Sequence, residues 1–248
     1  MLTIENNLQT EVVGSEDGKY TYEVRRSWGN GGKALVIELY PAVSAKKSGC
    51  WDLSAMHLIN HADELGWGEV RIINLYSKVF SSKPSVKELK SDVENTAYIR
   101  AIFEEEAVKD YDIVIAWGSS LETHLGTIHA KAELLDMLKE KGLENQVKHI
   151  ITDRLDTNGQ RGTHPLYLGL RYAKETWKLQ PYPLEKALEE LKNNIPKKLE
   201  KNLPNAEKAD TADSNREEKT ETPGQTNRIE VKPKKGRKKD VLPNKKPA

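Results

Sequence analysis

The sequence predicts an α/β fold in three layers, with a mostly parallel sheet of about four core strands. Four short apolar runs are rich in β-branched residues, and their hydrophobicity is continuous rather than alternating, as in buried parallel strands. Segments with the apolar spacing of helices separate the runs, and strands that alternate with helices imply right-handed βαβ units. The four predicted strands are KALVIELY (33–40), EVRIINLY (69–76), DIVIAW (112–117) and VKHIIT (147–152).

The remaining elements are predicted from the same kinds of pattern. YTYEVRRS (20–27) has polar alternation, which predicts an antiparallel edge strand. The predicted helix DLSAMHLINHADELG has Asp52 as its N-cap, apolar positions that include Leu53 and Met56, and a stop at Gly66. Further helices are predicted over 92–110, with Val93 on the apolar face, over 123–142 and over 182–203.

Composition divides the chain into a single α/β domain, 1–195, and a tail, 196–248. The tail has no aromatic residue, and beyond Leu203 its large aliphatic residues are only Ile229, Val231, Val241 and Leu242. Such a segment cannot bury enough apolar area to offset the entropy lost on ordering. We therefore predict the end of a helix followed by a disordered tail.

The two parts of the chain also differ in charge. The whole chain has a net charge of +1, but the tail contains 15 Lys and Arg against 9 Asp and Glu, which is net +6 and leaves the domain at −5. This predicts that DNA or RNA binds through the tail, with a solubility role or an acidic protein partner as alternatives. The basic cluster consists of Lys232, Lys234, Lys235, Arg237, Lys238 and Lys239.

Other sequence features bear on the cellular compartment. The start of the chain, MLTIENNLQT, lacks the basic and apolar regions of a secretory signal, and no apolar run reaches membrane-spanning length. Cys50 is the sole cysteine, which excludes an internal disulfide and fits a reducing compartment. We expect a cytoplasmic protein with no membrane partner.

The parallel sheet predicts where a ligand binds, because open sheets of this kind bind ligands outside the carboxyl ends of their strands. Residues at the ends of the first, second and third core strands, and after the fourth, are therefore candidates for one cleft. They are Tyr40 and Pro41, Asn74, Trp117 and Gly118, and His164.

Three polar residues stand out near these strand ends. Glu38 lies inside an apolar strand, where a carboxylate is costly to bury unless it is paired or its pKa rises. Asn74 suits either a ligand's hydrogen-bonding edge or its own local backbone. His164 precedes Pro165, so its backbone should be extended, and it either serves the site or caps LYLGL, which is predicted as strand or coil.

The sequence predicts neither a metal nor a cofactor. His57 and His61 have a metal-compatible spacing, but HLINH lacks the internal glutamate of zinc proteases and has no evident third ligand. WGNGGKA (28–34) contains glycines and a lysine, yet it precedes a strand instead of opening a helix, which is the wrong context for a phosphate loop.

Several motifs, in this order and spacing, resemble the domain-of-unknown-function 1643 family of bacterial and phage proteins. They are ALVIELYPAVSA, LSAMHLINHADELGWGEVRIINLYS, DVENTAYI, DIVIAWGSS and GTHPLYL, and they extend over about residues 20–172. This family has no established activity, so the resemblance implies a fold rather than a reaction.

The same series of strand ends is similar, more distantly, to the uracil-DNA glycosylase superfamily. That resemblance implies that Asn74 pairs with the edge of a flipped base and that His164 stabilises the charge developing on the leaving base. The superfamily carries a water-positioning Asp or Asn in its first loop. This chain has Tyr40-Pro41 where the 1643 family typically has Asn-Pro, so either Glu38 or Asp52 takes that role or glycosidic bonds are not hydrolysed.

These observations predict a base- or nucleotide-directed hydrolase that acts on or near nucleic acid. A non-catalytic module that binds nucleic acid or a nucleotide is the alternative, and a protein-interaction role for the tail is a third. The ligand can be DNA, RNA or a free nucleotide on this basis, and the sequence predicts no oligomeric state.

Overall fold

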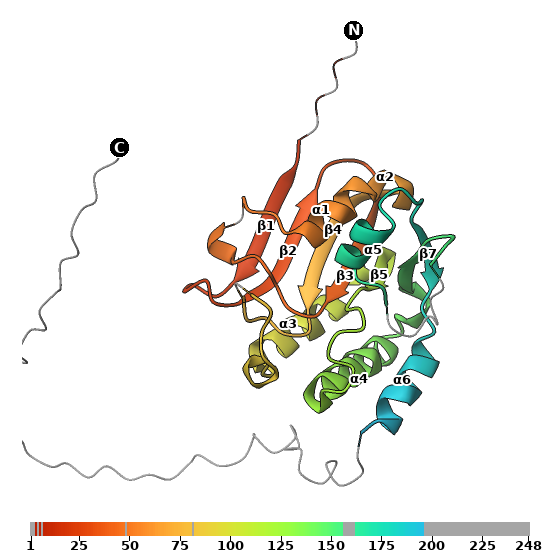
Figure 1. The fold of residues 1–248 in the computed structure, drawn as a ribbon. Coiled ribbons are helices and arrows are strands. Elements are labelled where there is room, and N and C mark those ends of the chain that lie inside the picture. The colour runs from red at the N-terminus through yellow and green to blue at the C-terminus, as the bar shows by residue number, and fades with distance from the viewer. Residues whose placement is uncertain are drawn as a thin grey trace, which may run out of the picture. The chain divides into compact units, whose positions relative to one another are not determined.

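The computed structural model describes residues 3, 5, 7–47, 49–80, 82–155 and 162–195 (Figure 1). These residues belong to the unit Met1–Leu203. The predicted tail, 196–248, and with it the basic cluster, lie outside the described residues. Within the described part of the chain, every helix is too short or too polar to cross a bilayer.

The described residues form a mixed α/β fold around a seven-stranded sheet. The order across the sheet is β1-β2-β4-β3-β5-β6-β7. The pairs β4–β3, β3–β5 and β5–β6 are parallel, and the pairs β1–β2, β2–β4 and β6–β7 are antiparallel. The strands are β1 (Gln9–Gly14), β2 (Thr21–Ser27), β3 (Gly32–Glu38), β4 (Trp67–Asn74), β5 (Tyr111–Ile115), β6 (Val147–Ile151) and β7 (Lys178–Pro181).

The predicted α/β class is confirmed, but the predicted sheet is not matched in detail. The sheet is larger than expected, and half of its pairings are antiparallel. The strand predicted over 20–27 is antiparallel, as β2, yet it lies between β1 and β4 rather than at an edge. The edge strands β1 and β7 gave little apolar signal because they are short and none of their residues is fully buried.

In the described part of the chain, six α-helices cover the two faces of the sheet (Figure 1). Alternate residues of β3 enter different cores: Leu35 and Ile37 pack with α3, α4 and α6, whereas Ala34 and Val36 pack with α1, α2 and α5. The helices are α1 (Leu53–Asn60), α2 (Ala62–Leu65), α3 (Val93–Glu104), α4 (Leu125–Glu140), α5 (Pro165–Arg171) and α6 (Leu184–Asn193). Short 3-10 helices are η1 (Ala45–Lys47), η2 (Val86–Glu88), η3 (Glu106–Asp110) and η4 (Glu144–Gln146).

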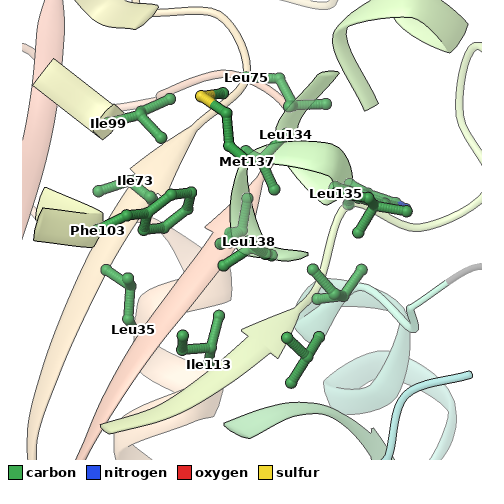
Figure 2. Close-up of a cluster of buried hydrophobic side chains, with 14 of the residues drawn as sticks. Leu35, Ile73, Leu75, Ile99, Phe103, Ile113, Leu134, Leu135, Met137 and Leu138 are labelled. Carbon is green, nitrogen blue, oxygen red and sulfur yellow. The ribbon is translucent and has the colours of Figure 1, made fainter. Parts of the chain in front are cut away.

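The larger core forms where α3 and α4 pack on the sheet. Figure 2 shows Phe103 of α3 and Leu138 of α4 beside strand side chains, among them Leu35, Ile73 and Ile113. Burial of these side chains removes apolar surface from water, which stabilises the three parallel strands that carry them. This core holds the central strands in register and thereby fixes where their carboxyl ends lie.

The segment predicted as one helix over 52–66 is divided into α1 and α2 at His61. Asp52 caps α1 as predicted, with its Oδ1 accepting a hydrogen bond from the Ala55 N–H at 2.9 Å. Leu53 and Met56, predicted to be core residues, are exposed, and so is Val93 at the start of α3. Leu53 lines the cavity described below, and Val93 is the first residue of α3.

The run LYLGL is neither strand nor coil but forms most of α5. Gly169 lets α5 approach α1 closely, because a Cβ at this position would lie 2.1 Å from Cγ of His57. His61 stacks on Trp177 with ring centroids 4.0 Å apart. Both histidines of HLINH thus have packing roles, and among the described residues no group of three or more potential ligands has metal-binding geometry.

Candidate active site

A cavity of about 810 Å³ lies at the carboxyl ends of the central strands. It is bounded by the end of β3 and the loop after it, by the start of α1, by Asn74 at the end of β4, and by residues 118–120 and 162–170. Its volume is in the range of small-molecule sites. The cavity lies at the strand ends where a ligand site was predicted, on the face of the sheet covered by α1 and α5.

The structure brings most of the predicted site residues together. The cavity is lined by Glu38, Tyr40, Pro41, Asp52, Asn74, Gly118 and His164. Trp117 does not line it, because side chains alternate along the strand direction and Trp117 enters the opposite core, where its ring meets Tyr182 edge-on. Trp117 is therefore a packing residue on the α4 and α6 side.

Glu38 and Asn74 are neighbours on adjacent parallel strands. They are Cα partners in the register of β3 and β4, and they share the sheet face of Val36 and Ile72. Their exposed fractions are only 7% and 3%. Neither Oε1 of Glu38 nor Oδ1 of Asn74 has a hydrogen-bond partner. A buried polar atom left in this state costs about 1–3 kcal/mol, so a group that fills the cavity and donates to these oxygens would recover that free energy.

The alternative role for Asn74, satisfying its local backbone, does not describe its side chain. Asn95 of α3 satisfies that backbone instead, since its Nδ2 donates to the carbonyl of Asn74 at 2.9 Å and to that of Leu75 at 3.3 Å. The strand end is therefore tied to α3 without the Asn74 side-chain oxygen, which has no partner although the residue lines the cavity.

The surroundings of Glu38 favour its protonated form. Burial raises the pKa of this carboxyl to about 8, and the negative charge of Asp52 adds to the effect. At neutral pH the side chain is then mostly a carboxylic acid, which donates one hydrogen bond and accepts others. Perturbed groups of this kind cluster at functional sites.

His164 is held as a neutral hydrogen-bond donor. It is the N-cap of α5 with extended backbone (φ −72°, ψ 134°), as the following proline predicts, and its Nδ1 accepts the Leu166 N–H at 3.2 Å. Because Nδ1 is an acceptor, the proton of the neutral ring is on Nε2. Burial lowers the pKa of His164 to about 4, against the opposing effect of Asp52, so the ring is neutral at pH 7.

Gly118 and Gly162 fix the position of His164. Both have positive φ, 63° and 58°, and the Gly118 N–H donates to the Gly162 carbonyl at 2.8 Å. A Cβ on Gly118 would approach Cβ of His164 to 3.0 Å. The turn after β5 therefore needs glycine both for its left-handed backbone and for close approach to the histidine.

Two features of the site were missed by sequence reasoning. Leu53, Tyr167 and Leu170 give the cavity an apolar lining on the side of α1 and α5, and a helical interpretation of HPLYLGL would have indicated the last two. Arg26, nearby on β2, is buried with its Nε and Nη1 unpartnered and with Cζ 4.8 Å from the centroid of the Trp51 ring. Its burial was hidden by the polar alternation of that strand.

The fold and the cavity define a mixed α/β protein with buried polar groups at the carboxyl ends of its parallel strands. Residues 21–166 match the model of the family described as Protein of unknown function (DUF1643). The match covers more than half of the chain, and the chain belongs to this family. No curated protein and no solved structure matches it.

We expect stability to depend on pH through Glu38. Its folded pKa of about 8 exceeds the ordinary 4.5, so the folded state binds a proton that the unfolded state has lost, and stability falls as pH rises between these values. Relative to Glu38→Gln, the natural chain should lose on the order of 3 kcal/mol of unfolding free energy between pH 5 and pH 8. Urea denaturation across this range measures the difference.

The matched control is Glu133→Gln, which changes an exposed glutamate on α4. This variant should keep the pH dependence of the natural chain. Equal pH dependence in Glu38→Gln and in the natural chain would show that Glu38 titrates as an ordinary surface carboxyl.

Proposed function

We propose that the protein is a hydrolase that binds a nucleobase in this cavity and cleaves the glycosidic bond that joins the base to its sugar. The observation that carries the proposal is the convergence of Glu38, Asn74, Asp52 and His164 on one cavity, with buried acceptor oxygens that lack partners. The resemblance to the uracil-DNA glycosylase superfamily supplies the reaction, and the geometry of the site supports it.

In the proposed reaction, each polar group has a role that its surroundings suit. Asn74 binds the hydrogen-bonding edge of the base. As the bond between base nitrogen and sugar carbon breaks, the bonding electrons pass to the base, and Nε2–H of His164 donates to the anion that forms. A neutral imidazole suits this role because it stabilises the anion without having to be charged at neutral pH.

Asp52 is the better of the two candidates for activating water. Glu38 is mostly protonated at neutral pH and cannot accept a proton readily. Asp52 lines the same cavity and is oriented by the hydrogen bond from Ala55. We propose that Asp52 takes the proton of a water whose oxygen bonds to the sugar carbon, while Glu38 binds the base as an acid.

A non-catalytic module that binds a base or nucleotide is the second candidate, and Tyr40 favours it. Tyr40 lines the cavity where the resemblance calls for a water-positioning amide, and its ring packs edge-on against Phe80 with centroids 5.9 Å apart. A phenol in this place is a poor substitute for that amide. A binding module would keep Asn74 and His164 but release no base.

Contact with nucleic acid is proposed through the tail rather than the domain. None of the described residues that line the cavity is a lysine or an arginine, and the domain has a net charge of −5. Phosphates would therefore be attracted mainly by the basic cluster at 232–239, which lies outside the described residues. A free nucleotide as ligand and an acidic protein as partner of the tail are the alternatives.

The proposed compartment is the cytoplasm, because a chain with a single cysteine fits a reducing environment.

Release of free base is the direct test of the hydrolase. Chromatography should detect it from a panel of nucleosides, RNA, and single- and double-stranded DNA that includes uracil and other modified bases. His164→Asn keeps a side chain suited to capping α5 but shortens the donor, and it should lower kcat by about 10²–10³. Asn74→Ala and Asp52→Asn should each remove most activity.

His129→Gln and Asn60→Ala are matched controls, because they change residues of α4 and α1 that do not line the cavity. Both should keep full activity, and circular dichroism should verify that every variant is folded. Absence of base release by the natural chain over the whole panel would overturn the hydrolase and leave the binding module.

The tail should govern affinity for nucleic acid. Truncation after Leu203 should weaken binding of single-stranded DNA and flatten its dependence on salt, because fewer counterions are released. Fluorescence anisotropy over a range of salt concentrations measures both quantities, and replacement of the six basic residues of the cluster by serine is the companion variant. Unchanged affinity would leave the tail as a solubility segment.

A further inference from the structure

The two unpartnered oxygens of residues that line the cavity indicate which hydrogen-bonding groups the ligand carries. Oε1 of Glu38 and Oδ1 of Asn74 are both acceptors, and both are buried. Their residues are Cα partners on adjacent parallel strands, which lie about 4.8 Å apart. Both residues line the cavity, so a small rotation of each covered side chain lets one ligand group meet both oxygens, and two hydrogen-bond donors are needed to satisfy them.

We propose that the base bound here carries an exocyclic amino group beside an unprotonated ring nitrogen, as cytosine and adenine do. The inference rests on the proposed function only in taking the ligand to be a nucleobase, and it requires no hydrolysis. The two N–H bonds of the amino group donate to Oδ1 of Asn74 and to Oε1 of Glu38. The other oxygen of the Glu38 acid donates its proton to the ring nitrogen.

Bases with an oxo group in place of the amino group fit this pair of residues less well. Uracil offers one N–H between two carbonyl oxygens at the corresponding edge, and hypoxanthine offers one N–H between a carbonyl oxygen and a C–H, so one buried acceptor stays without a donor. Guanine has an amino group, but its neighbouring ring nitrogen carries a proton that would face the O–H of the acid. In both cases a buried hydrogen-bond donor or acceptor is left unpaired. The free energy that this costs weakens the binding of these bases.

The electrostatics of the cavity agree with a neutral base rich in donors. Burial and the charge of Asp52 keep the pKa of Glu38 near 8, so its acid form, with one donor and one acceptor, is the form present at pH 7. The cavity lining contains two carboxyl groups and no lysine or arginine among its described residues. Leu53, Tyr167 and Leu170 offer apolar surface for the face of a ring.

The proposal predicts that binding of such bases weakens at alkaline pH. When Glu38 loses its proton, a carboxylate faces the lone pair of the ring nitrogen, and the hydrogen bond to that atom is lost. The other titratable side chains that line the cavity are Asp52 and His164, from the starts of α1 and α5, and Tyr40 and Tyr167. The pKa of His164 is lowered to about 4 by burial, so this histidine does not account for a change near pH 8.

Calorimetric titration with two matched pairs of nucleosides tests the inference. Cytidine and uridine differ at this edge of the base, as do adenosine and inosine. At pH 7 the full-length protein should bind the amino member of each pair about 10-fold to 100-fold more tightly. Equal or tighter binding of uridine and inosine, or no binding of any of the four, would overturn the proposal.

Variants of the two acceptor residues separate this preference from a general loss of folding. Glu38→Gln keeps one donor group and one acceptor, so it should retain the preference at pH 7 and lose the weakening above pH 8. Asn74→Ala should reduce the preference, whereas Asn60→Ala, an exposed change on α1, should leave it unaltered. The same pH dependence in Glu38→Gln as in the natural chain contradicts the role given to Glu38.

Measurement of base release on the same nucleosides distinguishes this inference from the hydrolase. Preferred binding of cytidine and adenosine without release supports the inference and rejects hydrolysis of these substrates. Release of uracil or hypoxanthine in preference to cytosine or adenine supports the hydrolase and overturns the inference.

Discussion

The parallel pairing of β3 with β4 is the constraint on which the site depends. Its register sets Glu38 beside Asn74 at the carboxyl ends of two buried strands, on the face covered by α1 and α5. A one-residue shift of either strand would turn its own polar side chain into the opposite core. Because the strands are buried on both faces, the carboxyl is removed from water, and its raised pKa follows from that burial.

Two further polar groups of the cavity, Asp52 and His164, are helix N-caps. Asp52 accepts the Ala55 N–H at the start of α1, and His164 accepts the Leu166 N–H at the start of α5. These local hydrogen bonds orient side chains that would otherwise be mobile, and in the histidine they also select the tautomer. Close packing of α5 on α1, which Gly169 permits, brings the two helix starts to the same cavity.

The sequence located the polar groups of the cavity because a simple rule connects strand ends to ligand sites. Glu38, Asn74 and His164 followed from that rule and from the cost of burying a carboxylate. Trp117 was wrongly placed in the cavity. The strand-end rule identifies where a strand ends, but alternate residues of a strand face opposite sides of the sheet, and Trp117 faces the other core. The edge strand β7 depends on pairing with β6, a segment distant in the sequence, which a local hydrophobic pattern does not contain.

Helix α5 was missed for a different reason. It has only seven residues and contains Gly169, so its propensity is weak and it is stabilised by packing on α1. The buried Arg26 was missed because polar alternation on β2 resembles a solvated edge. In both cases tertiary contacts outweighed the local signal.

The central claim is that the carboxyl of Glu38 is buried and protonated, and that it binds a ligand in the cavity. Carbon-13 NMR of glutamate side-chain carboxyls, with the Glu38 signal assigned by its absence in Glu38→Gln, observes this group directly. We predict that the signal titrates with a pKa near 8 and shifts when cytidine or adenosine is added. Titration near the ordinary value of 4.5, with no response to either nucleoside, would contradict this claim.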